Sequence, residues 1–263
     1  MITKVVVFDL DETLGYFTQL GVLFDTIETF TNKDIPFELF CKLFDLYKDI
    51  FRINIFSILN YLKRIKTRTN VKIMIYTNNQ GEKKWCENII KYIEHKISYK
   101  LFDHIIHAYK IGNKVIEECR TSHDKKYSDL IKCANLSDKT KVCFIDDQYH
   151  PYMKHKNVYY INIKPYTFKI NNDNFCSLFF ESEVFEDINK LYNIPDSEKF
   201  KTYIQDYFKN IKFINETTDE ELKVDKVLTK KIMYHIQKFI SRRNVTKKSK
   251  PTNASKRKTR KKK

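Results

Sequence analysis

The stretch VVVFDLDETL at residues 5–14 decides the fold of this chain. An apolar run of the length of a buried strand ends in two carboxylates, Asp9 and Asp11. Alternate residues of a strand point to one face, so these two side chains lie on the same side. Alone, the pattern also fits an acidic turn with a helix N-cap at Asp11. Two like charges at the end of an apolar run favour a cation between them, and so predict a divalent metal site.

Two later stretches strengthen the metal-site interpretation. Residues 71–79, VKIMIYTNN, form a second apolar strand pattern that ends in Thr77 and Asn78. Residues 142–148, VCFIDDQ, form a third pattern, which ends in the pair Asp146 and Asp147. In open parallel α/β sheets, ligands bind outside the carboxyl ends of the strands. We therefore expect these polar side chains and those of the first strand to form one site.

The three motifs together carry a resemblance to a known family. FDLDETL, IYTNN and FIDD resemble motifs I, II and IV of the haloacid dehalogenase superfamily of phosphotransferases, over residues 3–168. The form DLDETL is similar to that of the carboxy-terminal-domain (NLI-interacting-factor-like) phosphatases, which act on phosphoserine in RNA polymerase II and related phosphoproteins. Residues 120–133 and 161–168 also resemble phosphatases of this class encoded by large DNA viruses. The resemblance implies a doubly wound, mainly parallel, Rossmann-like α/β sheet with a minimal cap.

The residue types within these motifs imply a two-step phosphoryl transfer. Asp9 would attack phosphorus and form an aspartyl phosphate, and Asp11 would protonate the leaving oxygen and then activate water. Thr77 and Asn78 would hold the phosphoryl oxygens.

A lysine should neutralise the phosphate and the nucleophile. We choose Lys126, at the start of the helix that precedes the Asp146–Asp147 strand, with Lys125 nearly as suitable. The spacing departs most from the family here. Asp146 would orient the lysine.

Mg²⁺ is the expected cofactor. Asp9, the backbone carbonyl of Asp11 and Asp147 would bind it, with water completing the shell.

The expected activity is hydrolysis of phosphomonoesters, with phosphoserine or phosphothreonine protein as the first substrate class. The segments between the motifs are too short for a large lid, and an open site suits a macromolecular phosphate. A phosphate at a nucleic-acid end is the second class and a small phosphate ester the third. The alternative outside enzymes is a catalytically idle binding protein of the same fold, tethered by its basic tail.

Charge is concentrated at the end of the chain. Residues 246–263 hold ten Lys or Arg and no acid, which leaves +6 of the net +16 for residues 1–245. The tail has no apolar periodicity, so we expect it to be disordered. It fits a nuclear localisation signal, a non-specific nucleic-acid tether or a solubilising tail.

The cysteines and the hydropathy indicate in which cellular compartment the protein is expected. The six cysteines contain no C-x-x-C pair, which favours free thiols in a reducing compartment. No stretch approaches 18 apolar residues, so we expect no membrane span and no signal peptide. The expected location is the nucleus or cytoplasm. The resemblance to phosphatases encoded by large DNA viruses implies a viral factory instead.

The periodicity predicts the remaining architecture. We assign a phosphatase domain to 1–197, a helical segment to 198–245 and the tail to 246–263. Within the first, residues 15–35 are expected to form a flap-like turn. Two amphipathic helices are expected in 198–243, with a capping box at Thr218 and Glu221, and packing against the sheet is favoured over a partner-binding role. Further helices are expected at 37–51, 53–65, 82–97 and 127–134, and further strands at 102–108 and 158–163.

Overall fold

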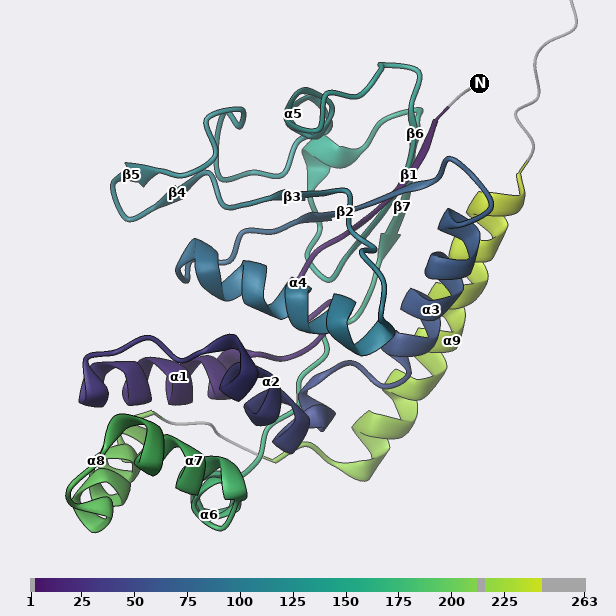
Figure 1. The fold of residues 1–263 in the computed structure, drawn as a ribbon. Coiled ribbons are helices and arrows are strands. Elements are labelled where there is room, and N and C mark those ends of the chain that lie inside the picture. The colour runs from purple at the N-terminus through teal and green to yellow at the C-terminus, as the bar shows by residue number, and fades with distance from the viewer. Residues whose placement is uncertain (1–2, 212–215, 243–263) are drawn as a thin grey trace, which may run out of the picture.

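The computed structural model describes residues 3–211 and 216–242 (Figure 1). Its centre is a five-stranded sheet in the order β3-β2-β1-β6-β7, in which every neighbouring pair is parallel. The strands are β1 (Lys4–Phe8), β2 (Lys72–Tyr76), β3 (His104–Ile106), β6 (Lys141–Asp146) and β7 (Val158–Asn162). From β1 the chain moves outward to β2 and β3, and it then returns to β6 on the other side of β1. This order is that of a doubly wound α/β fold, as the sequence predicts.

Alternation along the strands buries both faces of the sheet. In β1, Val6 and Phe8 belong to one hydrophobic cluster, whereas Val5 and Val7 belong to the other. The short helix α5 contributes Leu130 to the second cluster, and the other helices pack in the first. A strand covered on both faces reads as a continuous apolar run, which is why the strands were visible in the sequence.

The helices and the small hairpin complete the described chain, with α5 and α4 on opposite sides of the sheet (Figure 1). The helices are α1 (Thr18–Thr31), α2 (Phe37–Leu46), α3 (Ile55–Lys66), α4 (Lys83–Ile97), α5 (Tyr127–Cys133), α6 (Asn172–Phe180), α7 (Glu183–Tyr192), α8 (Ser197–Lys209) and α9 (Asp219–Ser241). Two 3-10 turns lie at Lys48–Ile50 and Pro151–Met153, and β4 (Lys110–Ile111) pairs antiparallel with β5 (Lys114–Val115).

The expectation of a flap-like turn at 15–35 is wrong, because most of this segment is the helix α1. Its apolar residues Leu20, Leu23, Phe24 and Ile27 recur at helical spacing and are buried. Gly15 lies before the helix, where a side chain would meet the ring of Phe17 at 2.6 Å. Gly15 therefore marks close packing rather than a flexible turn.

The two C-terminal helices pack into the main core. Phe200 and Ile204 of α8 and Ile236 of α9 belong to the same buried cluster as the first face of the sheet. The predicted capping box is present, with the side chain of Thr218 and that of Glu221 each bonded to the other's backbone. The tail at 246–263 lies outside the described residues.

The expectation that every cysteine is a free thiol is wrong for Cys119 and Cys133, which form a disulfide. Their Cα atoms lie 5.2 Å apart although 14 positions separate them in sequence. The fold brings together two residues whose spacing resembles no motif. Cys41, Cys86, Cys143 and Cys176 are free.

Across the described ranges, no helix combines the length and the apolar character that a membrane crossing requires.

Candidate active site

The carboxyl ends of β1 and β6 bring three acidic side chains together. Asp9 directly follows β1, and its backbone N–H donates to the carbonyl oxygen of Ile145 at 2.9 Å. Asp146 ends β6 and Asp147 follows it. Carboxylate oxygens of Asp9, Asp146 and Asp147 all lie within 4.8 Å of one another. These two strands flank the point where the strand order reverses, which is where doubly wound sheets bind ligands.

A buried lysine lies between two of these acids. Lys125 Nζ donates to Asp9 Oδ1 at 2.5 Å and to Asp146 Oδ2 at 2.7 Å. The side chain of Lys125 is only 2 % exposed, so the two contacts replace its hydration. It is the only ammonium that the described residues place against this cluster.

Of the two candidate lysines, the structure places Lys125 against the acids and not Lys126, which was our choice from the sequence. Lys126 Nζ donates to Thr121 Oγ1 at 3.0 Å and lies over the ring of Tyr152, away from the acids. Lys126 is the N-cap of α5 with an extended backbone. Consecutive side chains of an extended segment point to opposite sides, so a shift of one residue decides which lysine reaches the cluster.

The charges of the cluster perturb one another. Burial opposes the charge on Lys125, but Asp9 and Asp146 outweigh burial and raise the pKa of its ammonium. Burial raises the pKa of the Asp9 carboxyl well above its usual range, and the charges of Asp146 and Asp11 add to this effect. One ammonium thus faces four carboxylates, an excess that a bound cation would offset.

Asp11 is held differently from the other acids. Asn79 Nδ2 donates to Asp11 Oδ2 at 2.8 Å. Burial raises the pKa of the Asp11 carboxyl, which favours a protonated form that can donate. The sequence interpretation named Thr77 and Asn78 but gave no role to Asn79, the last residue of the TNN run, which contacts the second acid.

Thr77 and Asn78 follow β2, next to β1. Thr77 is buried, and its Oγ1 accepts a hydrogen bond from the Asn79 backbone N–H at 3.0 Å. The side-chain oxygen of Asn78 is engaged, because Oδ1 accepts from Arg120 Nη2 at 2.8 Å. The Thr77 hydroxyl, whose oxygen accepts that bond, can therefore still donate a hydrogen bond at the strand end. The Asn78 amide is instead turned toward Arg120.

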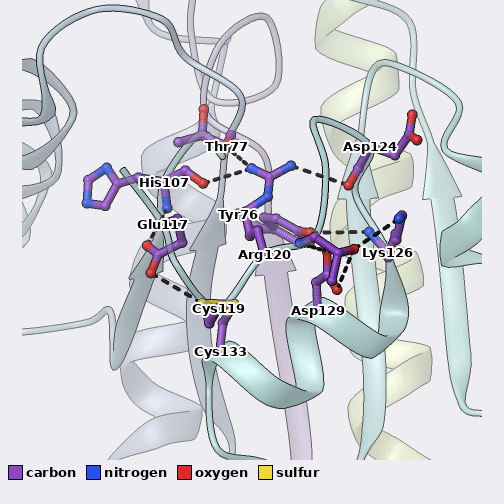
Figure 2. The surroundings of a disulfide bond; sticks show 11 residues. Tyr76, Thr77, His107, Glu117, Cys119, Arg120, Asp124, Lys126, Asp129 and Cys133 are labelled. Atoms are coloured by element: carbon purple, nitrogen blue, oxygen red, sulfur yellow. Dashed lines mark hydrogen bonds between the residues drawn. A yellow bond between two sulfur atoms is a disulfide. The ribbon is translucent and has the colours of Figure 1, made fainter. Parts of the chain in front are cut away.

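Arg120 fixes the loop of Thr77 and Asn78 (Figure 2). The sequence interpretation gave this arginine no role. Its Nη1 donates to the carbonyl oxygens of Thr77 at 3.1 Å and His107 at 2.7 Å. Its guanidinium lies 4.8 Å from the centre of the Tyr76 ring. The Cys119 disulfide adjoins Arg120, so a covalent link anchors the segment that ends in Lys125. No sequence motif signals an arginine whose partners are mostly backbone carbonyls.

The loop after β1 is fixed by a second buried arginine. Arg52 Nε donates to the carbonyl oxygen of Thr13 at 2.8 Å, and its Nη2 donates to that of Glu12 at 2.7 Å. Glu12 has a left-handed backbone with φ of 57°, which these contacts help to hold. Thr13 Oγ1 in turn donates to Asp147 Oδ1 at 3.0 Å.

The donor set of the cluster fits a hard divalent cation. Asp9, Asp146 and Asp147 offer only oxygen, which Mg²⁺ prefers, and they lie close enough to share one ion. Lys125 already engages one oxygen of Asp9 and one of Asp146. The second oxygen of Asp9 is not engaged by the lysine, whereas Asp146 Oδ1 accepts from the backbone N–H of Gln148 at 2.9 Å, so the lysine leaves Asp9 and Asp147 to hold an ion.

None of the protein-family models, curated proteins or solved structures compared with this chain matches it. What the fold and site define is a doubly wound α/β protein with an acidic cluster and a lysine at the switch point of its sheet.

Proposed function

We propose that the chain is a Mg²⁺-dependent phosphomonoester hydrolase of the haloacid dehalogenase type. The observation that carries this proposal is the position of Lys125, buried between Asp9 and Asp146 at the carboxyl ends of β1 and β6. A buried ammonium beside a strand-end carboxylate can neutralise an incoming phosphate without blocking the second carboxylate oxygen. The ordered motifs of the sequence support the same assignment.

Asp9 is the nucleophile in the first step. One of its carboxylate oxygens attacks phosphorus and forms a phosphorus–oxygen bond as the bond to the leaving oxygen breaks. Asp11, held by Asn79, gives its proton to that leaving oxygen. In the second step a water molecule gives a proton to Asp11 and attacks phosphorus, which releases phosphate and restores Asp9.

Charge on the phosphoryl group is balanced by Lys125 and by the metal. Asp9, Asp147 and the backbone carbonyl of Asp11 would hold Mg²⁺, with Asp146 fixing the lysine. When bound, the ion supplies positive charge at the phosphoryl oxygens. The Thr77 hydroxyl and the backbone N–H of Asn78 bind the remaining oxygens, since the Asn78 side chain is committed to Arg120.

Phosphoserine or phosphothreonine protein is the substrate class we propose. The DLDETL form of the first motif supports it. A phosphate at a nucleic-acid end is the second candidate, favoured by the ten basic residues of 246–263. An idle binding protein is disfavoured, because a scaffold gains nothing from four neighbouring carboxylates that cost stability.

A generic aryl phosphate tests the proposal. We expect turnover with Mg²⁺, loss of turnover in EDTA and recovery when Mg²⁺ is added back. Asp147→Asn should raise the Mg²⁺ concentration needed for half-maximal rate. Asp138→Asn, at an exposed acid outside the cluster, is the matched control and should leave that concentration unchanged. Full activity in chelator would contradict the metal requirement.

A further inference from the structure

A groove leads away from the proposed proton donor. It has a volume of about 720 Å³ and runs from Asp11 and Asn79 along α1 and the start of α4. Tyr207 of α8 borders it as well. Because the groove is continuous with Asp11, a molecule that places its phosphate at Asp9 can extend along it.

The floor of the groove is aromatic. The half-buried Trp85 packs edge-on against Phe24, with ring centres 5.2 Å apart. Gly21 of α1 faces the indole, and a Cβ there would lie 3.4 Å from it. The absent side chain leaves the face of α1 open beside Trp85, so an extended chain has an apolar surface to lie on.

The walls of the groove are acidic. Asp25 of α1 and Glu82 before α4 both line it, and burial together with the charge of Glu82 raises the pKa of Asp25. Within residues 3–211 and 216–242, neither carboxylate has a side-chain hydrogen bond or ion pair. Among the described residues that line the groove, Lys84 is the one cation, and it is paired with Asp34 at 2.5 Å. The groove therefore presents uncompensated negative charge.

We infer that this groove binds a stretch of the phosphoprotein substrate that carries a lysine or arginine near the phosphorylated residue. The inference rests on the proposed function and names the substrate class of the same site. A cationic side chain is complementary to Asp25 and Glu82, while its aliphatic stem suits Trp85. A nucleic-acid strand would bring further phosphates against these acids, so the groove disfavours it.

Helix geometry gives the length of the groove along α1. Thr18 and Asp25 both line the groove and are seven residues apart on α1, a rise of about 10 Å. An extended peptide covers that length in about three residues. The groove therefore accommodates about three extended residues alongside α1, and the test places the basic residue at that spacing from the phosphoserine.

The test compares phosphopeptides that differ at one position. The whole 263-residue chain is assayed on peptides with Lys, Ala or Glu three residues from phosphoserine on either side, and on an aryl phosphate. We expect kcat/KM to be about five to ten times higher for the Lys peptide than for the Ala peptide on one side, as one or two exposed charge pairs would give.

Variants of the groove show whether its acids cause the preference. Asp25→Asn with Glu82→Gln should remove most of the preference and leave the aryl phosphate rate unchanged, and Asp25→Lys with Glu82→Lys should favour the Glu peptide. Asp138→Asn with Glu186→Gln removes two exposed acids outside the groove and is the matched control. The basic tail is present in every variant, so it cannot cause a difference between them.

Equal turnover of the three peptides by the wild type, or a Lys preference that survives Asp25→Asn with Glu82→Gln, would overturn the inference. Faster turnover of a 5′-phosphorylated oligonucleotide than of the Lys peptide would overturn it too. Turnover of the aryl phosphate in those cases shows that the proposed function stands without it. Absence of all turnover contradicts the function itself.

Discussion

Arg52 Nε donates a hydrogen bond to the carbonyl oxygen of Thr13 at 2.8 Å, which joins the segment before α3 to the loop after β1. Arg52 Nη1 also pairs with Asp225 of α9, 173 positions later in the chain. Thr13 Oγ1 continues the connection to Asp147 Oδ1 at 3.0 Å. A C-terminal helix is thus linked through one arginine to the acidic cluster.

Removal of Asp225 should weaken both the fold and the site. Asp225→Ala leaves the buried Arg52 charge without its partner, so we expect the free energy of unfolding to fall by about 3 kcal/mol or more. The loop at Thr13 should also loosen, which lowers kcat on an aryl phosphate more than it changes KM. Asp225→Asn keeps an acceptor for Arg52 and should restore much of kcat. Urea unfolding and steady-state kinetics measure the two effects.

The surface pair of Lys42 and Asp187 is the control for Asp225. Asp187→Ala should change stability and kcat very little, because both side chains are solvent-exposed. Equal effects of Asp225→Ala and Asp187→Ala would show that the Arg52 connection has no special role.

The two neighbouring lysines should behave differently. Lys125→Met removes the ammonium between Asp9 and Asp146, and we expect kcat/KM on an aryl phosphate to fall by about a hundredfold or more. Lys126→Met should leave it nearly unchanged, because Lys126 contacts Thr121. Circular dichroism of both variants controls for folding. The opposite ranking of the two variants would return the motif lysine to position 126.

The disulfide gives a prediction about stability. Closing a loop between Cys119 and Cys133, 14 positions apart, stabilises the fold by about 3 kcal/mol in the chain-entropy description. Dithiothreitol should therefore lower the free energy of unfolding of the wild type by about this amount. It should have no such effect on Cys119→Ser with Cys133→Ser. Identical urea midpoints for oxidised and reduced wild type would contradict the stabilising link.

His107 gives a prediction about pH. Burial, with the nearby charge of Lys83, lowers the pKa of His107 from its usual 6.5 to about 4. Between these values the unfolded chain takes up a proton that the folded protein does not, so stability falls as pH drops from 6.5 toward 4. His107→Gln removes this proton uptake and should flatten the dependence across that window. Urea unfolding at pH 7, 6, 5 and 4.5 measures it, and equal slopes for both proteins would contradict the assignment.

The strands and their terminal acids were predictable because their signal is local. An apolar run that ends in Asp9 or in Asp146 needs no knowledge of the rest of the chain. Parallel pairing then brings the ends together by geometry alone. The fold class and the acidic cluster followed from this rule.

The remaining features depend on contacts that sequence spacing does not encode. The choice between Lys125 and Lys126 depends on one residue of register before α5. Arg52 and Arg120 fix their loops largely through backbone carbonyls, which any sequence provides. A turn was expected across 15–35, yet Gly21 within that segment allows Trp85 to pack closely on the helix α1.

The most direct test of the account is to trap the phosphorylated nucleophile. The protein is mixed with a ³²P-labelled phosphopeptide and Mg²⁺, quenched in acid within the first turnover and digested for mass spectrometry. We predict label on the peptide that contains Asp9 and none in Asp9→Asn. Turnover that persists in Asp9→Asn, or label on any other residue, would contradict the proposed mechanism.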